Sequence, residues 1–124
     1  MIAGVGTDMI EVDRIAAKIS KEMGFRELVF SKNEIQYCEA RTNRYQHYAA
    51  RFAAKEAFFK ALGTGWKNGT SFHEVEVVHD EQGRPGIRLT GQTASTLAGI
   101  GIRNILLSLT HLKTLASAIV IIET

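Results

Sequence analysis

The sequence predicts an α+β fold, in which a small, mostly antiparallel sheet packs with one long helix and several shorter helices. The segments with strand character follow one another through hairpins and do not alternate regularly with helices, which separates this class from α/β folds. A chain of 124 residues with 45% hydrophobic and 23% charged residues has the size and composition of one globular domain. The sequence contains no linker, repeat or low-complexity segment, so we expect a single domain over residues 1–124.

The first expected element is a strand, Ile2–Thr7, in which apolar and small residues alternate. Gly4 and Gly6 leave one side of this strand bare. Asp8 follows where the strand pattern ends, and a strand end is a frequent place for a metal ligand because the strand fixes the side chain. The alternative is that Asp8 caps the following helix, since aspartate is a favoured N-cap residue.

Two helices are expected next. The first runs from about Glu11 to Met23, and its buried side carries apolar residues at helical spacing: Ile15, Ile19 and Met23. The second runs from Lys32 to about Arg41. It begins with a capping box, in which Ser31 and Glu34 satisfy each other's backbone amides.

A long helix is expected from about Arg44 to Leu62. Within it, Glu56 and Lys60 are four residues apart and lie on the same face, one turn from each other. Phe52 and Phe59 flank that face, so we expect it to turn inward and away from bulk water. The alternative is an ordinary amphipathic helix, because exposed Glu–Lys pairs at this spacing are common and contribute only ~0.3–0.5 kcal/mol.

A carboxylate and an ammonium group at the edge of a core suit a metal–phosphate site. Carboxylate oxygens bind a hard cation, and an ammonium group binds phosphate oxygens. The helix that carries Glu56 and Lys60 is expected to stop at Gly63, and a second glycine follows at Gly65. Backbone without a side chain can approach a ligand closely at such positions.

The second half of the chain supplies most of the sheet. Its expected elements are a strand Phe72–His79, a strand Gly86–Leu89, a helix from about Gln92 to Gly99, and strands Ile105–Thr110 and Ala116–Ile122. Pro85 is expected in the turn between the first two of these strands. The last strand is apolar on both faces near its end, so it should be central in the sheet or covered, for example by another subunit.

Two motifs in this order resemble a known family. They are G-V-G-T-D-M-I-E-V-D-R-I near the N-terminus and R-F-A-A-K-E-A-F-F-K-A-L-G-T-G from Arg51 to Gly65. Together they resemble the holo-acyl-carrier-protein synthases, the short single-domain class of 4′-phosphopantetheinyl transferases. The resemblance extends to S-F-H-E-V-E-V, D-E-Q-G-R-P and S-L-T-H-L-K, and therefore covers nearly the whole chain. It implies the 4′-phosphopantetheinyl transferase-like fold.

The resemblance also implies a reaction. Such enzymes transfer 4′-phosphopantetheine from coenzyme A to a serine of apo-acyl carrier protein in fatty acid biosynthesis, and they release adenosine 3′,5′-bisphosphate. By position in the matched motifs, Asp8 and Glu56 would hold Mg²⁺, which neutralises charge on the pyrophosphate, and Lys60 would be the third catalytic residue. The group that takes the serine proton, a metal-bound water or a carboxylate, stays open.

Coenzyme A carries a 3′-phosphate that needs cationic partners. The matched motifs imply five residues that bind coenzyme A: Arg51, Lys60, Gly63, Thr110 and His111. The alternatives are that Arg51 is a solvated helix charge and that His111 is a surface or capping residue. The remaining histidines, His47, His73 and His79, lack metal-ligand spacing and are expected to be structural or solvated.

Acyl carrier proteins are strongly acidic, so the transferase needs a basic face. The expected carrier-binding residues are Arg14, Lys18, Lys21, Phe25 and Arg26. The first three share one side of the first helix, and Phe25 would add an apolar anchor at the edge of this patch. The alternative is a solvated helix face, which is the usual meaning of such charges.

Three positions depart from the family pattern. Leu106 stands where many relatives carry a histidine, and Leu115 replaces an aromatic residue, so both could alter the adenine pocket. Met9 after Asp8 is a volume-conserving change and should be tolerated.

The expected location is the cytoplasm. No apolar run reaches the ~18–20 residues of a membrane span, and no cationic segment precedes an apolar stretch at the N-terminus. The single cysteine, Cys38, is expected to be a packing residue and suits a reducing compartment. By resemblance we also expect a homotrimer with active sites at the subunit interfaces.

Two other functions are compatible with the same residues. One is a Mg²⁺-dependent phosphohydrolase, which would use Asp8 and Glu56 to activate water and would need no carrier-binding patch. The other is a non-catalytic module that binds coenzyme A or a nucleotide, in which Glu56 only completes a charge network.

Overall fold

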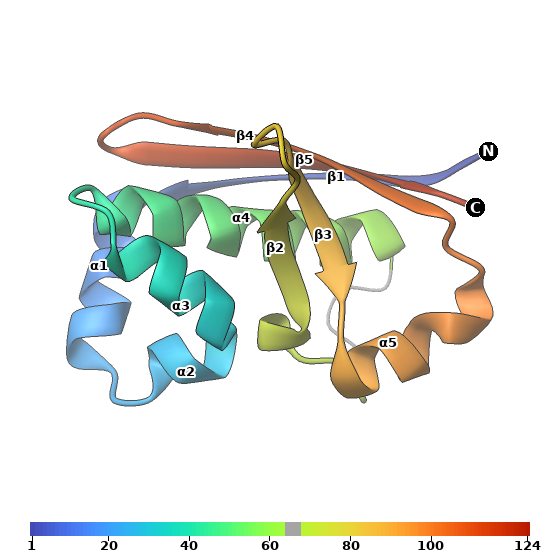
Figure 1. Cartoon of the computed structure of the whole chain (residues 1–124), viewed down its shortest axis with the longest axis horizontal. Helices are drawn as coiled ribbons and strands as arrows, with labels where there is room; N and C mark the ends of the chain where they lie inside the picture. Colours follow the sequence, from blue (N-terminus) through green and yellow to red (C-terminus); the bar gives the residue numbers. More distant parts are fainter. Residues whose placement is uncertain (64–67) are drawn as a thin grey trace.

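The structure is a computed structural model that describes residues 1–63 and 68–124. It contains a five-stranded antiparallel sheet in the order β1-β5-β4-β3-β2, which confirms the α+β class (Figure 1). The strands are β1 (Ile2–Glu11), β2 (Val75–His79), β3 (Pro85–Leu89), β4 (Asn104–His111) and β5 (Leu115–Glu123). Gly65, the second glycine of the long motif, lies outside the described residues.

One long helix, α4 (Arg44–Leu62), lies beneath β1 and β5 (Figure 1). The shorter helices are α1 (Val12–Lys21), α2 (Phe25–Val29), α3 (Lys32–Glu39) and α5 (Gly91–Leu97), with 3₁₀ turns η1 (Phe72–Glu74) and η2 (Ala98–Ile100). The expected bounds of the long helix are confirmed. None of the helices in the described ranges is long and apolar enough to cross a membrane.

Helix α4 packs backbone to backbone against β1. A Cβ atom added to Gly4 would lie 1.8 Å from the carbonyl oxygen of Ala61, and one added to Gly6 would lie 2.0 Å from that of Ala57. The facing side of α4 is rich in buried alanines, so no large side chain on either element separates the two backbones. The bare side predicted for the first strand is therefore the contact surface for the helix.

Strand β5 is central among the longest strands. Its Ala118 pairs with Asp8 of β1 on one side and with Leu109 of β4 on the other. Alternate residues, including Val120 and Ile122, are buried against α4, which confirms the prediction that this strand is central.

The outer face of the same strands carries exposed apolar side chains. They are Val5, Met9, Leu106 and Ile119, which are between 39% and 65% exposed. We call these four residues the outer apolar face.

Several expectations about the first third of the chain were wrong. Strand β1 continues to Glu11, so Asp8 lies inside the strand and does not cap α1, whose N-cap is Glu11. Helix α1 ends at Lys21, which leaves Met23 fully exposed, and the short helix α2 was not foreseen. Ile15 is buried and Ile19 is partly buried, as expected.

Two differences concern the second half of the chain. Phe72–Glu74 forms a 3₁₀ turn, where a strand was expected, and the strand starts at Val75. Pro85 is the first residue of β3 and does not belong to the turn before it. Proline suits the first position of a strand because it lacks the amide that the ladder would need.

The expectations for α3 hold. The Ser31 hydroxyl accepts the amide of Glu34, and the Glu34 carboxylate accepts the amide of Ser31, which completes the capping box. Cys38 is fully buried, and this burial raises the pKa of its thiol to about 12. It is therefore a packing residue with an unreactive thiol.

Candidate active site

The fold brings Asp8, Glu56 and Lys60 together where β1 crosses α4. The Lys60 ammonium donates to Asp8 Oδ1 at 3.0 Å and to the carbonyl oxygen of Thr7 at 3.0 Å. Glu56 lies one turn before Lys60 on the same helix face. Asp8 and Gly6 share a side of β1, and that side faces α4 because Gly6 packs against Ala57.

This cluster lies at the boundary between core and solvent. The Lys60 side chain is 56% exposed and Asp8 is 16% exposed, while Glu56 is half-buried. The prediction that the whole face turns inward is therefore wrong for Lys60. Its ammonium is exposed, and it can turn toward a phosphate if it gives up its contacts with Asp8 and Thr7.

Glu56 lies in an unfavourable electrostatic environment. Burial raises the pKa of its carboxyl group, the nearby Asp8 carboxylate raises it further, and Lys60 opposes both effects. Within residues 1–63 and 68–124, no hydrogen bond or ion pair reaches the Glu56 carboxylate. A cation between Asp8 and Glu56 would remove the repulsion.

The donor set fits Mg²⁺ better than a metal held by protein ligands alone. Mg²⁺ usually takes one or two carboxylates and completes its shell with water and substrate phosphates. In the described part of the chain, no third His, Cys, Asp or Glu joins Asp8 and Glu56. The two carboxylates would therefore leave most of the coordination shell to a phosphate ligand and water.

A second cluster forms around Tyr37 at the other side of α4. The guanidinium carbon of Arg41 lies 4.0 Å from the Tyr37 ring centroid, and that of Arg51 lies 4.2 Å from it. Arg51 is almost fully buried, so the alternative of a solvated helix charge is wrong. Its Nε is buried and has no hydrogen-bond partner among the described residues, and one of its terminal nitrogens lies 3.5 Å from the carbonyl oxygen of His47.

Three histidines extend this cluster. The His47 and His111 rings are 5.2 Å apart, and His79 stacks on Tyr37 at 5.2 Å. His111 Nδ1 lies 2.9 Å from Gln46 Oε1. Burial, followed by the positive charge of Arg51, lowers the pKa of His47 to about 4. We call Tyr37, Arg41, His47, Arg51, His79 and His111 the arginine–histidine cluster.

The sequence pointed to only two members of this cluster, Arg51 and His111. His47 and His79 were expected to be structural or solvated, and Tyr37 and Arg41 were not considered. Tyr37 and Arg41 are four residues apart, but α3 ends at Glu39, so Arg41 lies beyond the helix and helical spacing did not indicate their contact. Nothing in the sequence indicated that His79, from β2, would stack on that tyrosine.

A hollow of about 670 Å³ opens beside this cluster. It forms because β3 and β4 pair only at Gly86 and Leu106 before they diverge. Its lining comes from three segments, 78–80, 84–86 and 105–109. His79 and Arg84 supply polar groups, and Leu106 also lines it.

The other predicted coenzyme A residues lie in different places. Thr110 is exposed on β4, and His111, the last residue of that strand, points to the opposite side. Gly63 ends α4 with φ +81°, the left-handed conformation that glycine adopts without strain. The helix stop expected there is confirmed.

The predicted carrier-binding cations differ in how free they are. Lys18 pairs with Glu22 at 3.4 Å, and Arg26 pairs with Glu27 at 2.8 Å and with Glu39 at 3.3 Å. Arg14 and Lys21 are exposed on α1, and no ion pair involves either of them within the described ranges.

Phe25 lies beside these cations. The Lys18 ammonium lies 5.6 Å from its ring centroid, and the ring packs against Phe52 of α4 at 6.4 Å. The predicted carrier-binding cations are thus next to Phe25, which contacts Phe52 of α4, the helix that carries Glu56.

Comparisons with known proteins show the family of the chain. Residues 4–109 match the model of the 4′-phosphopantetheinyl transferase superfamily. The chain is 46% identical to the holo-[acyl-carrier-protein] synthase of Ruminiclostridium cellulolyticum over 96% of this chain and 90% of the relative. It is 43% identical to that of Solibacter usitatus over 99% of both chains.

Solved structures show the same fold. The holo-[acyl-carrier-protein] synthase of Neisseria meningitidis superposes with a TM-score of 0.90 at 30% identity, over 100% of both chains. The synthase of Bacillus anthracis, in complex with CoA (3′,5′-ADP), superposes with a TM-score of 0.82 at 33% identity, over 100% of this chain and 98% of that one. The chain therefore belongs to the holo-[acyl-carrier-protein] synthases of the 4′-phosphopantetheinyl transferase superfamily.

Proposed function

We propose that this chain, as a single domain, transfers 4′-phosphopantetheine from coenzyme A to a serine of apo-acyl carrier protein in fatty acid biosynthesis. The products are holo-acyl carrier protein and adenosine 3′,5′-bisphosphate. The observation that carries the proposal is the convergence of Asp8, Glu56 and Lys60 from β1 and α4, in a chain of this family. Phosphoryl transfer depends mostly on positioning and charge neutralisation, which these three groups can provide.

We assign the metal site to Asp8 and Glu56 and the metal to Mg²⁺. When bound, the ion would neutralise the negative charge that develops on the pyrophosphate. Asp8 is fixed by its place inside β1, and Glu56 is fixed by α4, so the two carboxylates are held by the rigid core. Lys60 would move from Asp8 toward the pyrophosphate and stabilise the leaving phosphate.

We assign the 3′-phosphate of coenzyme A to Arg51 and His111 in the arginine–histidine cluster. The buried, unpartnered Nε of Arg51 supports this assignment, because a donor of this kind costs free energy until an acceptor reaches it. Lys60, Gly63 and Thr110 remain the other proposed coenzyme A contacts. His79 lines the hollow between β3 and β4, and we propose that this hollow receives the adenine base of coenzyme A.

The two assigned sites support a homotrimer. Arg51 and Glu56 are five residues apart, so their side chains leave α4 about 140° apart and serve different sides of the helix. We propose that Asp8 and Glu56 of one chain and the arginine–histidine cluster of its neighbour bind one coenzyme A. The outer apolar face would be covered at the same interface. A monomeric mass in light scattering would contradict this arrangement.

The carrier protein is proposed to bind across α1 and α2, at Arg14, Lys18, Lys21, Phe25 and Arg26. Arg14 and Lys21 can meet carboxylates directly, whereas Lys18 and Arg26 must first exchange their own acidic partners. We place the reaction in the cytoplasm, which suits the unpaired, buried thiol of Cys38.

The experiment that tests the proposal is intact mass spectrometry of an apo-acyl carrier protein incubated with the enzyme, coenzyme A and Mg²⁺. We expect the carrier to gain the mass of one phosphopantetheine, and we expect EDTA to abolish the gain. Binding of coenzyme A without any gain on several carriers would favour the non-catalytic binding module. Hydrolysis of coenzyme A without carrier modification would favour the phosphohydrolase.

A further inference from the structure

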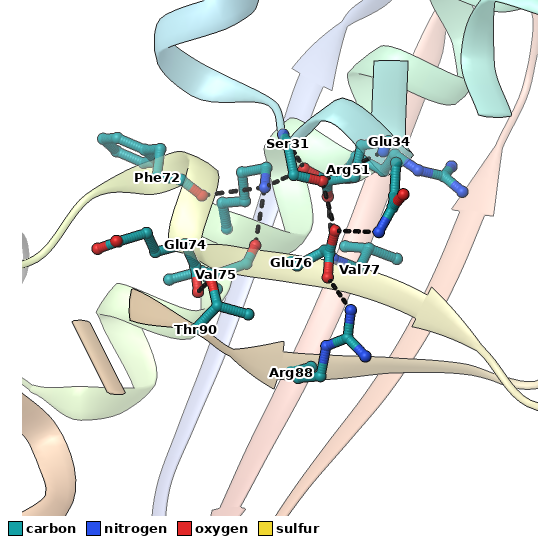
Figure 2. Close-up of polar contacts among 12 residues, drawn as sticks. Ser31, Glu34, Arg51, Phe72, Glu74, Val75, Glu76, Val77, Arg88 and Thr90 are labelled. Atoms are coloured by element: carbon teal, nitrogen blue, oxygen red, sulfur yellow. Dashed lines mark hydrogen bonds and ion pairs between the residues drawn. The ribbon is translucent and has the colours of Figure 1, made fainter. Parts of the chain in front are cut away.

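Lys55, the residue before Glu56, is fully buried, and its ammonium group donates three hydrogen bonds, one for each of its protons. Its Nζ donates to Glu34 Oε1 at 2.7 Å, to the carbonyl oxygen of Phe72 at 3.0 Å and to that of Val75 at 2.7 Å. Figure 2 shows these three acceptors on α3 (Glu34), at the start of η1 (Phe72) and at the start of β2 (Val75). An ammonium group has no further donor, so Lys55 cannot touch a substrate and can act only through its partners.

The partners of Lys55 are themselves fixed. Glu34 also accepts the amide of Ser31 at 2.9 Å and that of Val77 at 2.9 Å. The lysine therefore ties both ends of η1 to a carboxylate that is locked between α3 and β2. A buried ion pair often adds little net stability, so stability alone does not explain the Lys55–Glu34 pair, and a positioning role is compatible with it.

The segment that Lys55 holds packs beside the proposed metal site. The Phe72 ring stacks on Phe52 at 6.1 Å and meets Phe59 edge-on at 5.2 Å. Phe52 and Phe59 are four residues before and three residues after Glu56, so they share its face of α4. A shift of η1 would therefore move the aromatic surface next to Glu56.

The same segment also forms a wall on the side of α2. Thr70, Ser71 and Phe72 line a hollow of about 400 Å³ together with Leu28, whose side chain is largely exposed. Phe25 of α2 packs on Phe52, which connects this hollow to the proposed carrier-binding surface. We call residues 70–72, which end at the first residue of η1, the η1 wall. Through Phe72 it contacts Phe52 and Phe59, which flank Glu56, and Phe52 in turn contacts Phe25 of the proposed carrier-binding surface.

We propose that Lys55 is a positioning residue that fixes the η1 wall and thereby sets how the carrier serine approaches the reacting phosphate. The inference rests on the proposed function. It assigns Lys55 to the carrier side of the reaction, because its hydrogen bonds within the described residues go to Glu34, Phe72 and Val75. Arg51 lies one turn earlier on α4; burial lowers the pKa of Lys55 and the charge of Arg51 lowers it further, but Arg51 shares no hydrogen bond with the lysine. Loss of Lys55 should therefore affect the carrier and leave the affinity for coenzyme A unchanged.

The test uses two variants of the full chain. Lys55→Met leaves the Glu34 carboxylate buried and unpaired, which by itself can prevent folding. The double variant Lys55→Met/Glu34→Gln removes both charges and restores neutrality, but the carbonyl groups of Phe72 and Val75 still lack their donor. We expect the double variant to fold, to bind coenzyme A within twofold of wild type, and to lose about tenfold in kcat/KM for the carrier.

Turnover is expressed per coenzyme A-binding molecule, so that a purely unfolded fraction does not count as a kinetic loss. Hydrogen exchange by mass spectrometry should show faster exchange at residues 70–75, while β1 and β5 stay protected. The matched control is Arg88→Met. Arg88 pairs with Glu76 at 2.6 Å, and Glu76 accepts the hydroxyl of Ser31 in the same network, but Arg88 has no hydrogen bond to the described residues of η1. We expect this control to keep wild-type kinetics and wild-type exchange at residues 70–75.

Wild-type carrier kinetics in the double variant would overturn the inference, and so would a parallel loss of coenzyme A affinity. These results leave the proposed function intact, because wild-type enzyme in the same assay still modifies the carrier. A wild-type enzyme that gives no mass gain would overturn the proposed function and this inference with it.

Discussion

The backbone contact between β1 and α4 makes Gly6→Ala the most informative single substitution. An added Cβ would lie 2.0 Å from the carbonyl oxygen of Ala57 and 2.7 Å from the amide nitrogen of Ala61. Even a close C–H···O contact keeps carbon and oxygen about 3.3 Å apart, so strand and helix would have to separate by about 1.3 Å. Both obstacles are backbone atoms, which cannot rotate away as a side chain would.

This separation has a cost in stability. Overpacking a core costs about 1–3 kcal/mol, and we expect the upper end, about 3 kcal/mol, because whole elements must move. Urea unfolding measures this as a lower midpoint with an unchanged slope. Gly99→Ala is the control. Gly99 is exposed, does not adopt a left-handed φ, and has no atom of the described residues within 4 Å of an added Cβ.

The same separation should impair the proposed chemistry. Asp8 shares its side of β1 with Gly6, and Glu56 precedes Ala57 on α4, so the displacement acts directly on the distance between the two carboxylates. A misplacement of about 1 Å can cost about 100-fold in rate. We expect kcat to fall by about this factor in the mass-spectrometric assay. The reasoning is refuted if Gly6→Ala unfolds within about 0.5 kcal/mol of wild type and keeps its turnover.

Three further substitutions test the proposed sites. Glu56→Gln should abolish transfer yet stabilise the metal-free protein by about 0.5 kcal/mol, because it removes a half-buried charge repelled by Asp8; lower stability in thermal melts with EDTA would contradict this. Arg51→Met should weaken coenzyme A about 10-fold or more but dephospho-coenzyme A far less, and NMR should find the pKa of His47 risen from about 4 toward its ordinary 6.5; equal losses for both ligands would remove the 3′-phosphate assignment. Arg14→Ala should raise KM for the carrier with little change in kcat, and an equal rate loss at saturating carrier would place Arg14 elsewhere.

The sequence predicted the elements whose signals are local. The capping box at Ser31 and Glu34, the left-handed stop at Gly63 and the full extent of α4 each depend on residues within a few positions of one another. The class of the sheet and the central place of β5 followed from apolar patterning. These features hold because local propensity and packing agree.

The expectations that were wrong involve partners that are distant in sequence. Strand β1 runs past Thr7 because β5 offers pairing partners as far as Leu115, which the alternation of the first residues does not encode. Met23 is exposed because α1 stops early and the chain turns at Gly24, where φ is +83°. Periodicity counts apolar residues, but it does not show where a helix must end to fit the next one.

The site was predicted unevenly for the same reason. Asp8, Glu56 and Lys60 carry motif signals, and the fold brings them together. The arginine–histidine cluster takes Tyr37 from α3, His79 from β2 and His111 from β4, and only the tertiary fold joins them. Lys55 stands in the matched motif, but the sequence did not show that it would be buried against a carboxylate 21 residues away.

The stacking of Arg41 and Arg51 on a single tyrosine has a consequence for the lifetime of the enzyme. The positive charges of Arg41 and Arg51 repel each other at this ring. The ligand-free protein is therefore higher in free energy than a form in which a phosphate lies between the two guanidinium groups. A ligand present at 100 times its Kd stabilises the native state by about 2.7 kcal/mol, and the native state alone contains this cluster. We therefore expect the melting temperature to rise with coenzyme A. The amount of enzyme that survives proteolysis would then follow the supply of its own substrate.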